Sequence, residues 1–247
     1  MRKILVIPDI HGRSFWKESV EKYTDEVDKV MFLGDIVDPY PDENITRKEA
    51  INILKETIEY KKKYKDKVIL LYGNHDASYA LPNFIRCTRF DSSNAYKIKE
   101  IYYSHKDLFK LAHEEVLNGK KYLFTHAGLM NSWIKRHEKL IGEQTVESLN
   151  GLAKLRIGSA ILSEMSRYRS WTGEESGSIL WSDIQEKISD DSTIDNIITE
   201  DDAIVEGYDY QIFGHTFLER PIITDKWACL DCQKAFILDE EGTLKEV

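Results

Sequence analysis

Five short polar motifs recur along the chain, and each directly follows a run of apolar residues. In chain order the motifs are Asp9-x-His11, Gly34-Asp35-x-x-Asp38, Gly73-Asn74-His75-Asp76, His126-x-Gly128 and Gly214-His215-Thr216. Carboxylate, amide and imidazole side chains are the oxygen and nitrogen ligands of hard or borderline metal ions. Asp9 and His11 are two residues apart at the end of a strand, and where the strand ends and a loop begins both side chains can point toward one ion. The motifs therefore predict a metal site, in which a pair of ions would need one bridging carboxylate.

The apolar runs before the motifs have the length of β-strands and mostly lack alternation of polar and apolar residues. They cover residues 4–7, 30–33, 68–72, 122–124 and 210–213. Such runs are typical of strands that are buried on both faces of a sheet. Ligands of open α/β sheets bind beyond the carboxyl ends of the strands, so we expect the motifs to open onto one edge.

Helices are expected between the first strands. Thr46 and Glu49 have the spacing of a capping box, and Ile51, Leu54 and Ile58 recur on one helical face. The order strand, helix, strand, helix, strand up to residue 72 predicts a parallel sheet with right-handed crossovers. Glycines next to the first three motifs allow backbone or ligand to approach closely.

Beyond the third motif the pattern is less regular. A non-periodic stretch at 77–96 predicts a long loop that carries Arg86 and Arg89, and a helix is expected near 105–117. From about 130 to 207 the chain leaves the sheet pattern. This stretch predicts a mainly helical cap, inserted into a single domain that spans residues 1–247. Short strands are expected near residues 210, 222, 227 and 235.

The composition limits the class of protein. A chain of 247 residues that is 42% hydrophobic and 11% aromatic can bury a sizeable core. The formal net charge of −9 argues against a nucleic-acid-binding role, because that affinity depends on Lys and Arg. No apolar run is long enough for a membrane span, and three cysteines fit a reducing cytoplasm. Cys229 and Cys232 have the spacing of a redox pair, but packing as small apolar residues is the favoured interpretation.

The ordered set of motifs resembles the calcineurin-like metallophosphoesterases. The similarity is greatest to the branch that holds the serine/threonine phosphoprotein phosphatases and the bacterial diadenosine tetraphosphatases. The motifs extend from Asp9 to His215, and about a dozen fixed positions occur in the family's order. The resemblance implies a two-sheet α/β sandwich with an inserted cap, and a metal-dependent hydrolase of phosphate esters.

The resemblance also implies a role for each motif residue. The family's ligands of the first ion correspond to Asp9, His11 and Asp35, and those of the second ion to Asp35, Asn74, His126 and His215. Asp35 would therefore bridge two divalent ions, which would share the water that attacks phosphorus in line. His75 corresponds to the general acid that protonates the leaving oxygen, and Asp38 to the carboxylate that orients it. Manganese is the expected metal, with iron, zinc, cobalt or nickel as alternatives.

The sequence departs from the phosphoprotein phosphatases at their arginines. Asp38 is followed by Pro39-Tyr40 where that branch has Arg-Gly, and no arginine occurs from residue 171 to 219. Two bidentate phosphate clamps are thus missing from their usual places. Residues that could bind substrate instead are Arg13, Arg86, Arg89, Arg167, Arg169 and Trp181. For each of these arginines the alternative is an ordinary surface position.

Two further positions bear on the branch within the family. Many relatives have a second histidine that completes the first metal site, but this chain has Phe217 there. The first ion is therefore expected to have three protein ligands plus solvent, as in the phosphatase branch. The segment Leu180-Trp181-Ser182-Asp183 resembles a segment of the same branch.

These features favour a dinuclear, metal-dependent phosphomonoesterase that acts on phosphoprotein or a small phosphate. The alternative is a nucleotide pyrophosphohydrolase of the diadenosine tetraphosphatase kind, in which Tyr168, Trp171 or Trp181 could stack on a base. A binding scaffold without activity is a third hypothesis, against which the intact ligand set and His75 argue. The expected partner is a phosphorylated protein, small molecule or nucleotide, and no membrane.

Overall fold

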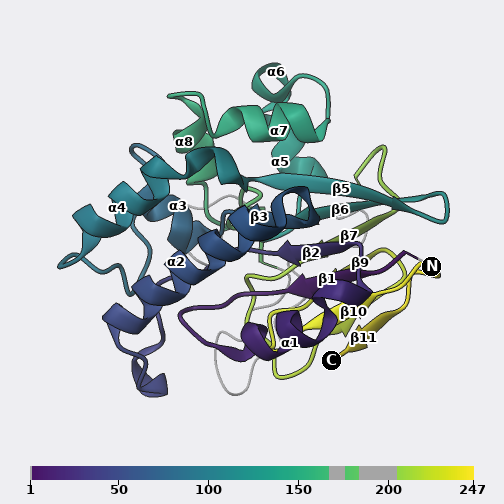
Figure 1. Ribbon diagram of the computed structural model, residues 1–247. Helices are drawn as coiled ribbons and strands as arrows, with labels where there is room; N and C mark the ends of the chain where they lie inside the picture. The colour runs from purple at the N-terminus through teal and green to yellow at the C-terminus, as the bar shows by residue number, and fades with distance from the viewer. Residues whose placement is uncertain (1, 167–175, 184–204) are drawn as a thin grey trace, which may run out of the picture. The chain divides into compact units, whose positions relative to one another are not determined.

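The computed structural model of the chain describes residues 2–166, 176–183 and 205–247. It forms two compact units, the first made of Met1–Lys110 with Cys232–Val247 and the second of Leu111–Asp231. Each unit is built around one mixed β-sheet with helices beside it (Figure 1). The predicted α/β class with two sheets is therefore confirmed.

The sheet of the first unit has six strands in the order β11-β10-β1-β2-β3-β4. Their bounds are β1 Ile4–Ile7, β2 Lys29–Phe32, β3 Val68–Leu71, β4 Phe109–Lys110, β10 Phe236–Leu238 and β11 Leu244–Glu246. Strands β1 to β4 run parallel, whereas β10 is antiparallel to β1 and to β11. The β1 side chains are all fully buried, as expected for a strand covered on both faces.

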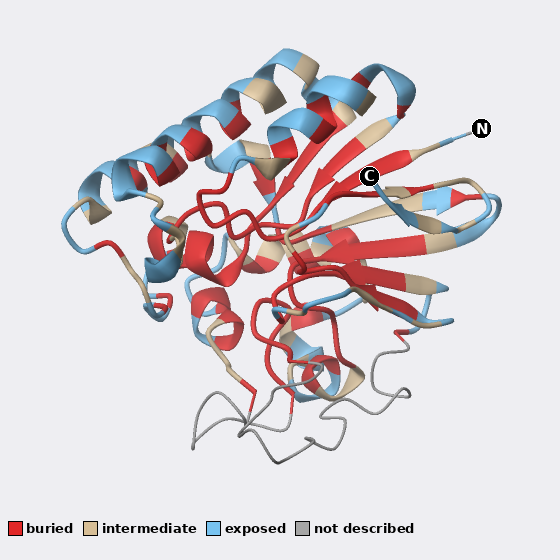
Figure 2. Cartoon of the chain, turned by 90° about the horizontal axis from the view of Figure 1, so that it is seen from below, coloured by how far each residue is buried: buried red, intermediate tan, exposed pale blue. Residues whose placement is uncertain are grey.

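The helices of the first unit are α1 Phe15–Tyr23, α2 Arg47–Tyr64, α3 Asn74–Ala80 and α4 Ala95–Ser104. Helix α2 begins at the predicted capping box. Glu49 N donates to Thr46 Oγ1 at 3.2 Å, and Thr46 N donates to Glu49 Oε2 at 2.7 Å. Such a cap stabilises a helix by about 1 kcal/mol. The predicted apolar stripe of α2 is buried, and its other face is exposed (Figure 2).

The sheet of the second unit has five strands in the order β5-β6-β7-β9-β8. Their bounds are β5 Ala112–Leu117, β6 Lys120–Thr125, β7 Tyr210–Phe213, β8 Ile222–Ile223 and β9 Trp227–Cys229. Strands β6, β7 and β9 run parallel, with β5 and β8 antiparallel at the two edges. The late strands expected near residues 210, 222, 227 and 235 are confirmed.

The described part of the second unit contains four short helices, namely α5 Asn131–Arg136, α6 Glu138–Ile141, α7 Val146–Leu152 and α8 Gly158–Leu162. Asn150 ties α7 to the first strand of the sheet. Its side-chain oxygen accepts from Leu111 N at 2.7 Å and from Ala112 N at 3.0 Å, and its amide donates to Ala112 O at 3.0 Å. These bonds satisfy backbone groups at the start of the edge strand β5.

The helix expected at 105–117 is wrong, because residues 112–117 form strand β5. Asn118 (φ +46°) and Gly119 (φ +78°) form a two-residue turn that pairs β5 with β6. An Asn-Gly pair between strands is a strong hairpin signal, because both positions require left-handed backbone. The loop expected at 77–96 is also shorter than predicted, since α3 continues to Ala80.

The cap expected at 130–207 lies in a range that the structure describes only in part. Helices α5 to α8 occupy its first portion, whereas residues 167–175 and 184–204 lie outside the described residues. The single domain with an inserted cap therefore stays a prediction. In the described part of the chain, no helix combines the length and the apolar character that a membrane crossing requires. Cys87, Cys229 and Cys232 are buried thiols, which agrees with the packing interpretation.

Candidate metal centre

The polar motifs of the first unit follow three neighbouring parallel strands. Ile7 pairs with Phe32 and Phe32 with Leu70, so β1, β2 and β3 end side by side. The residues that follow them therefore share one edge of this sheet, as expected. Backbone bonds join the first two loops, since His11 N donates to Asp35 O at 2.7 Å.

Two glycines allow the loops after β2 and β3 to meet. A Cβ atom on Gly34 would lie 2.3 Å from Gly73 N, and one on Gly73 would lie 2.0 Å from Asp35 Oδ1. Gly34 also has φ +103°, a backbone conformation that favours glycine. This close approach lets His75 N donate to Asp35 Oδ1 at 2.9 Å. The predicted use of these glycines is confirmed.

Asp9, His11 and Asp35 form a buried cluster in which one potential ligand atom of each lies within 4.8 Å of the others. His11 Nδ1 bonds to Val37 O at 3.0 Å, so Nε2 is the nitrogen that faces Asp35, at 3.4 Å from Oδ2. A backbone carbonyl on the far nitrogen is the usual way to orient a metal-binding imidazole. Two carboxylates and one imidazole match the ligand preferences of a divalent transition metal.

The electrostatics of His11 favour the form that binds metal. Burial, followed by the nearby His75 and Arg89, holds the pKa of His11 well below its usual value. The imidazole is therefore neutral at physiological pH, and only the neutral ring offers a lone pair to a cation.

Asn74 is the first residue of α3 and is almost fully buried. Its side-chain nitrogen donates to Cys87 Sγ at 3.4 Å, which fixes the orientation of the amide. Burial raises the pKa of the Cys87 thiol above its usual range, so Cys87 is a neutral neighbour and not a thiolate ligand. The amide oxygen is the side-chain atom of Asn74 that could bind a metal ion.

His75 and Asp38 form a buried pair, with 2.9 Å between His75 Nδ1 and Asp38 Oδ2. Tyr79, one turn later in α3, donates to Asp38 Oδ1 at 2.6 Å. Burial raises the pKa of Asp38 to about 7, against the opposing effects of the Tyr79 bond and of Arg89 and Arg47. The ring of His75 also packs edge-on to His11, with 5.0 Å between ring centroids. An imidazole held by a carboxyl thus lies next to the metal-ligand cluster.

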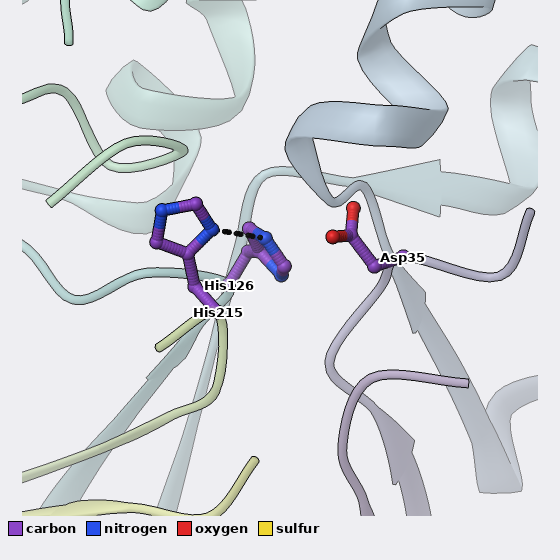
Figure 3. Close-up of side chains that lie close together, drawn as sticks. All are labelled: Asp35, His126 and His215. Carbon is purple, nitrogen blue, oxygen red and sulfur yellow. Dashed lines mark hydrogen bonds between the residues drawn. The ribbon is translucent and has the colours of Figure 1, made fainter. Parts of the chain in front are cut away.

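The second unit brings two imidazoles together at the ends of neighbouring parallel strands. Tyr122 of β6 pairs with Tyr210 of β7, and Gly214 N donates to His126 O at 2.7 Å. His126 Nε2 lies 3.1 Å from His215 Nδ1 (Figure 3). Two ligands about 2.1 Å from one ion and at right angles to each other are separated by roughly 3 Å. The pair therefore fits adjacent coordination positions of a single ion.

His215 is also held from its other side. Asp183 Oδ1 lies 3.4 Å from His215 Nε2, and Ser166 Oγ donates to the other Asp183 oxygen. Trp181 packs edge-on to the imidazole, with 5.7 Å between ring centroids. The sequence segment 180–183 thus contributes directly to the orientation of a predicted ligand. A carboxylate on the far nitrogen of a ligating histidine also raises its basicity.

Comparison with known protein families identifies the fold and the reaction class. A model of the family described as calcineurin-like phosphoesterase matches residues 2–217, which include all five motifs. This chain belongs to the calcineurin-like phosphoesterases. The phosphoesterase is accordingly a hydrolase of a metal-dependent family that acts on phosphorylated substrates. No curated protein matches its sequence.

Solved structures share the fold of this phosphoesterase. A protein serine/threonine phosphatase from Saccharomyces cerevisiae, described as similar to human phosphatase PP5, aligns over 99% of this chain and 79% of its own, with a TM-score of 0.57 and 13% identity. A hypothetical protein from Pyrococcus horikoshii OT3 aligns over 100% of this chain and 87% of its own, with a TM-score of 0.51 and 11% identity. At such identities the similarity concerns the fold alone.

The candidate substrate-binding residues of the phosphoesterase have different surroundings. Arg13 is buried and forms a bidentate pair with Glu43, with 2.7 Å from Nη2 to Oε1 and 2.9 Å from Nε to Oε2. Arg86 is exposed and stacks on Phe90, with 5.1 Å from the guanidinium carbon to the ring centroid. Trp181 is buried against His215. Arg167 and Arg169 lie outside the described residues.

Some residues of the phosphoesterase site were not predicted from the sequence. Tyr79 is one, although its position four residues after His75 in a helix is a local signal that places both on one face. Glu43 is another, and it lies 30 residues from Arg13 with no sequence pattern that connects the two.

Outside the site, His113 was expected in a helix. It lies in β5 instead and pairs with Glu115 at 2.9 Å.

Proposed function

We propose that this phosphoesterase hydrolyses phosphomonoesters of phosphoproteins or small molecules with the help of two divalent ions. The observation that carries the proposal is His75, an imidazole held by Asp38 and packed beside the Asp9, His11 and Asp35 cluster within one unit. An oriented imidazole next to a metal site is suited to protonate a leaving oxygen. Phosphate monoesters of alcohols need such a proton, because an alkoxide is a poor leaving group.

The residues that would hold the ions are those of the family resemblance. We assign Asp9, His11 and Asp35 to the first ion, and Asp35, Asn74, His126 and His215 to the second, with Asp35 shared. When bound, divalent ions lower the pKa of water and offset charge on the phosphoryl group. Manganese remains our first choice, with iron, zinc, cobalt and nickel as alternatives. The expected cytoplasmic location stays a prediction.

His75 supplies the proton in the proposed reaction. A water oxygen forms a bond to phosphorus and releases a proton to solvent, and the ester bond between phosphorus and the leaving oxygen breaks. The electron pair of that bond stays with the leaving oxygen, which takes the Nε2 proton of His75. Asp38 holds Nδ1 throughout and thereby fixes the direction of Nε2. The products are an alcohol and inorganic phosphate.

Two features support a monoester substrate over the alternative. Phe217 stands where a further histidine ligand occurs in other branches, and the 180–183 segment resembles that of phosphoprotein phosphatases. The alternative, a nucleotide pyrophosphohydrolase, rested on aromatic residues that could stack on a base. Trp181 is buried beside His215, and Tyr168 and Trp171 lie outside the described residues. Trp181 therefore gives this alternative little support.

One comparison tests the proposed function. Manganese-loaded protein is assayed with a phosphomonoester, a phosphodiester, a phosphopeptide and diadenosine tetraphosphate under the same conditions. We expect the highest kcat/KM on the monoester or the phosphopeptide. A preference of tenfold or more for diadenosine tetraphosphate would replace the proposal by the pyrophosphohydrolase. Activity on none of the four, with both ions bound, would support the binding scaffold.

A further inference from the structure

Arg89 has surroundings unlike those of the other arginines near His75. Its Nη2 lies 3.3 Å from His75 Nε2, the nitrogen that would give the proton. Arg13 is paired with Glu43, Arg47 lies 3.8 Å from Asp91 Oδ1, and Arg86 is exposed. Among the described residues, no carboxylate side chain forms a salt bridge with Arg89. Its guanidinium therefore lies near Asp38, whose pKa it lowers, without a direct salt bridge to a carboxylate in this part of the chain.

The side chain of Arg89 is also held in place by contacts that do not involve its terminal nitrogens. Nε donates to Asp38 O at 3.2 Å, and the guanidinium lies over the ring of Tyr40 with 3.8 Å from its carbon to the ring centroid. Stacking on an aromatic face orients a guanidinium without using its N–H donors. Tyr40 is fixed in turn, edge-on to His11 at 5.1 Å between ring centroids.

The backbone at Arg89 is equally constrained. Its φ of +62° is unusual for a residue with a side chain. The segment is anchored on both sides, because Cys87 N donates to Ser78 Oγ at 3.1 Å and Asp91 N donates to Tyr79 OH at 2.5 Å. Phe90 also stacks on Tyr79, with 4.4 Å between ring centroids. Non-glycine residues in such a conformation persist when the surroundings impose it, and they cluster at functional sites.

We propose that Arg89 is the phosphate-binding arginine of this enzyme and that the Tyr40 ring positions it. This inference rests on the proposed phosphomonoesterase function. The guanidinium would bind non-bridging phosphoryl oxygens with two parallel N–H bonds, next to the leaving oxygen that faces His75. His75 Nε2 and Arg89 Nη2 cannot both donate to each other, so substrate would draw the guanidinium onto its own oxygens. Pro39-Tyr40 stands where the phosphoprotein phosphatases have Arg-Gly. In this chain the Tyr40 ring at that place supports Arg89, an arginine from another loop.

The test compares Arg89→Ala and Arg89→Lys with the wild type, all loaded with manganese. Arg156, an exposed arginine with no salt bridge among the described residues, supplies the control Arg156→Ala with the same loss of charge. Binding of inorganic phosphate is measured by titration calorimetry, and kcat and KM are measured on an alkyl phosphate and a nitrophenyl phosphate. Thermal denaturation and metal analysis confirm that each variant is folded and loaded.

We expect Arg89→Ala to weaken phosphate binding about 10- to 100-fold, the loss typical of a charged hydrogen-bond pair. It should lower kcat/KM by a similar factor on both esters, because phosphoryl binding does not depend on the leaving group. Arg89→Lys should recover only part of the loss, since lysine lacks the planar fork. Tyr40→Ala should reproduce a milder loss, and Tyr40→Phe, which keeps the ring, should not.

Unchanged phosphate affinity in folded, metal-loaded Arg89→Ala and Arg89→Lys would overturn the proposal for Arg89. A loss confined to the alkyl phosphate would also overturn it, since that pattern would mean that Arg89 acts through His75. Failure of the wild type to hydrolyse either ester would refute the proposed function instead. The phosphate titration would then still decide whether Arg89 binds the anion.

Discussion

His75 is the single residue on which the proposed proton transfer depends. Its Nδ1 bonds to Asp38, so Nε2 is the ring nitrogen that would give a proton to the leaving oxygen. His75 is not a ligand in this scheme, although its neighbour Asn74 is. The role of His75 can therefore be separated from metal binding by experiment.

We predict that His75→Ala retains both ions and loses about 10²- to 10⁴-fold in turnover on an alkyl phosphate. The loss should be much smaller on a nitrophenyl phosphate, because nitrophenolate departs without a proton. Steady-state kinetics on both esters and metal analysis of the purified variant provide the measurement. Equal losses on the two esters, or loss of metal, would show that His75 has a structural or ligand role.

Asp38 gives a prediction about stability and pH. Its folded-state pKa is about 7, above the ordinary value near 3.9. In the pH range between these two values, the Asp38 carboxyl therefore takes up a proton when the chain folds. The stability that the protonated carboxyl provides is present below about pH 4 and is lost as pH rises to about 7. Asp38→Asn, which stays neutral, should therefore gain stability relative to wild type between pH 4.5 and 8, by up to ~4 kcal/mol.

Urea unfolding of metal-free wild type and Asp38→Asn at the two pH values measures this difference. Because only the difference between the two proteins is compared, titration of other carboxyl groups cancels. A difference that stays constant with pH, or that moves in the opposite direction, would mean that Asp38 is ionised throughout this range.

At the scale of structural elements, the cluster depends on how closely two loops approach. The loops after β2 and β3 touch through Gly34 and Gly73, which puts Asp35 beside the start of α3. The clash expected for a methyl group at Gly73 involves both backbone and carboxylate atoms of Asp35. The Asp35 backbone nitrogen lies 2.3 Å from the added carbon, so rotation of the carboxylate would not relieve the clash and the loops would have to separate.

We predict that Gly73→Ala destabilises the protein by about 1–3 kcal/mol and weakens manganese binding, because it displaces Asp35. Gly151→Ala is the matched control. Gly151 lies inside α7 with no atom within 4 Å of the added Cβ, so alanine there should stabilise the helix by up to about 1 kcal/mol. Thermal unfolding and manganese titration of both variants test this contrast. Equal behaviour of the two alanines would contradict the described loop contact.

For the whole molecule, the proposed assignment links metal binding to folding. The proposed ligands are Asp9, His11, Asp35, Asn74, His126 and His215, and an ion that they hold binds the folded chain more tightly than the unfolded one. Metal binding should therefore stabilise the folded chain as a whole, by an amount that rises with metal concentration.

We predict that manganese-reconstituted protein holds about two ions per chain, as dinuclear phosphoesterases do. Asp35→Asn should weaken both ions because Asp35 is the shared ligand, whereas His126→Ala should weaken mainly one. Metal analysis after gel filtration, together with the metal-dependent rise in Tm, gives the measurement. One tightly bound ion, left unaffected by Asp35→Asn, would rule out the shared-ligand assignment.

The sequence by itself determined the family, the reaction class, the residue types of the site and several local structures. The motifs sufficed because each follows an apolar run of strand length, and the parallel strands of one sheet end at a common edge. The Thr46 and Glu49 cap was predictable because a capping box involves only four consecutive residues. The β5–β6 hairpin was predictable in the same way from Asn118-Gly119, although we expected a helix there.

Only the tertiary structure decided which polar groups are paired and which remain for a substrate. Arg13, Arg86 and Arg89 are all candidates from the sequence, yet Glu43 pairs with the first, the second is exposed beside Phe90, and the third lies against His75. The same holds for Asp38, whose pKa is raised by burial that no local pattern reveals. Pairing and burial depend on residues distant in sequence, so the physical basis of substrate binding emerges only when the chain is folded.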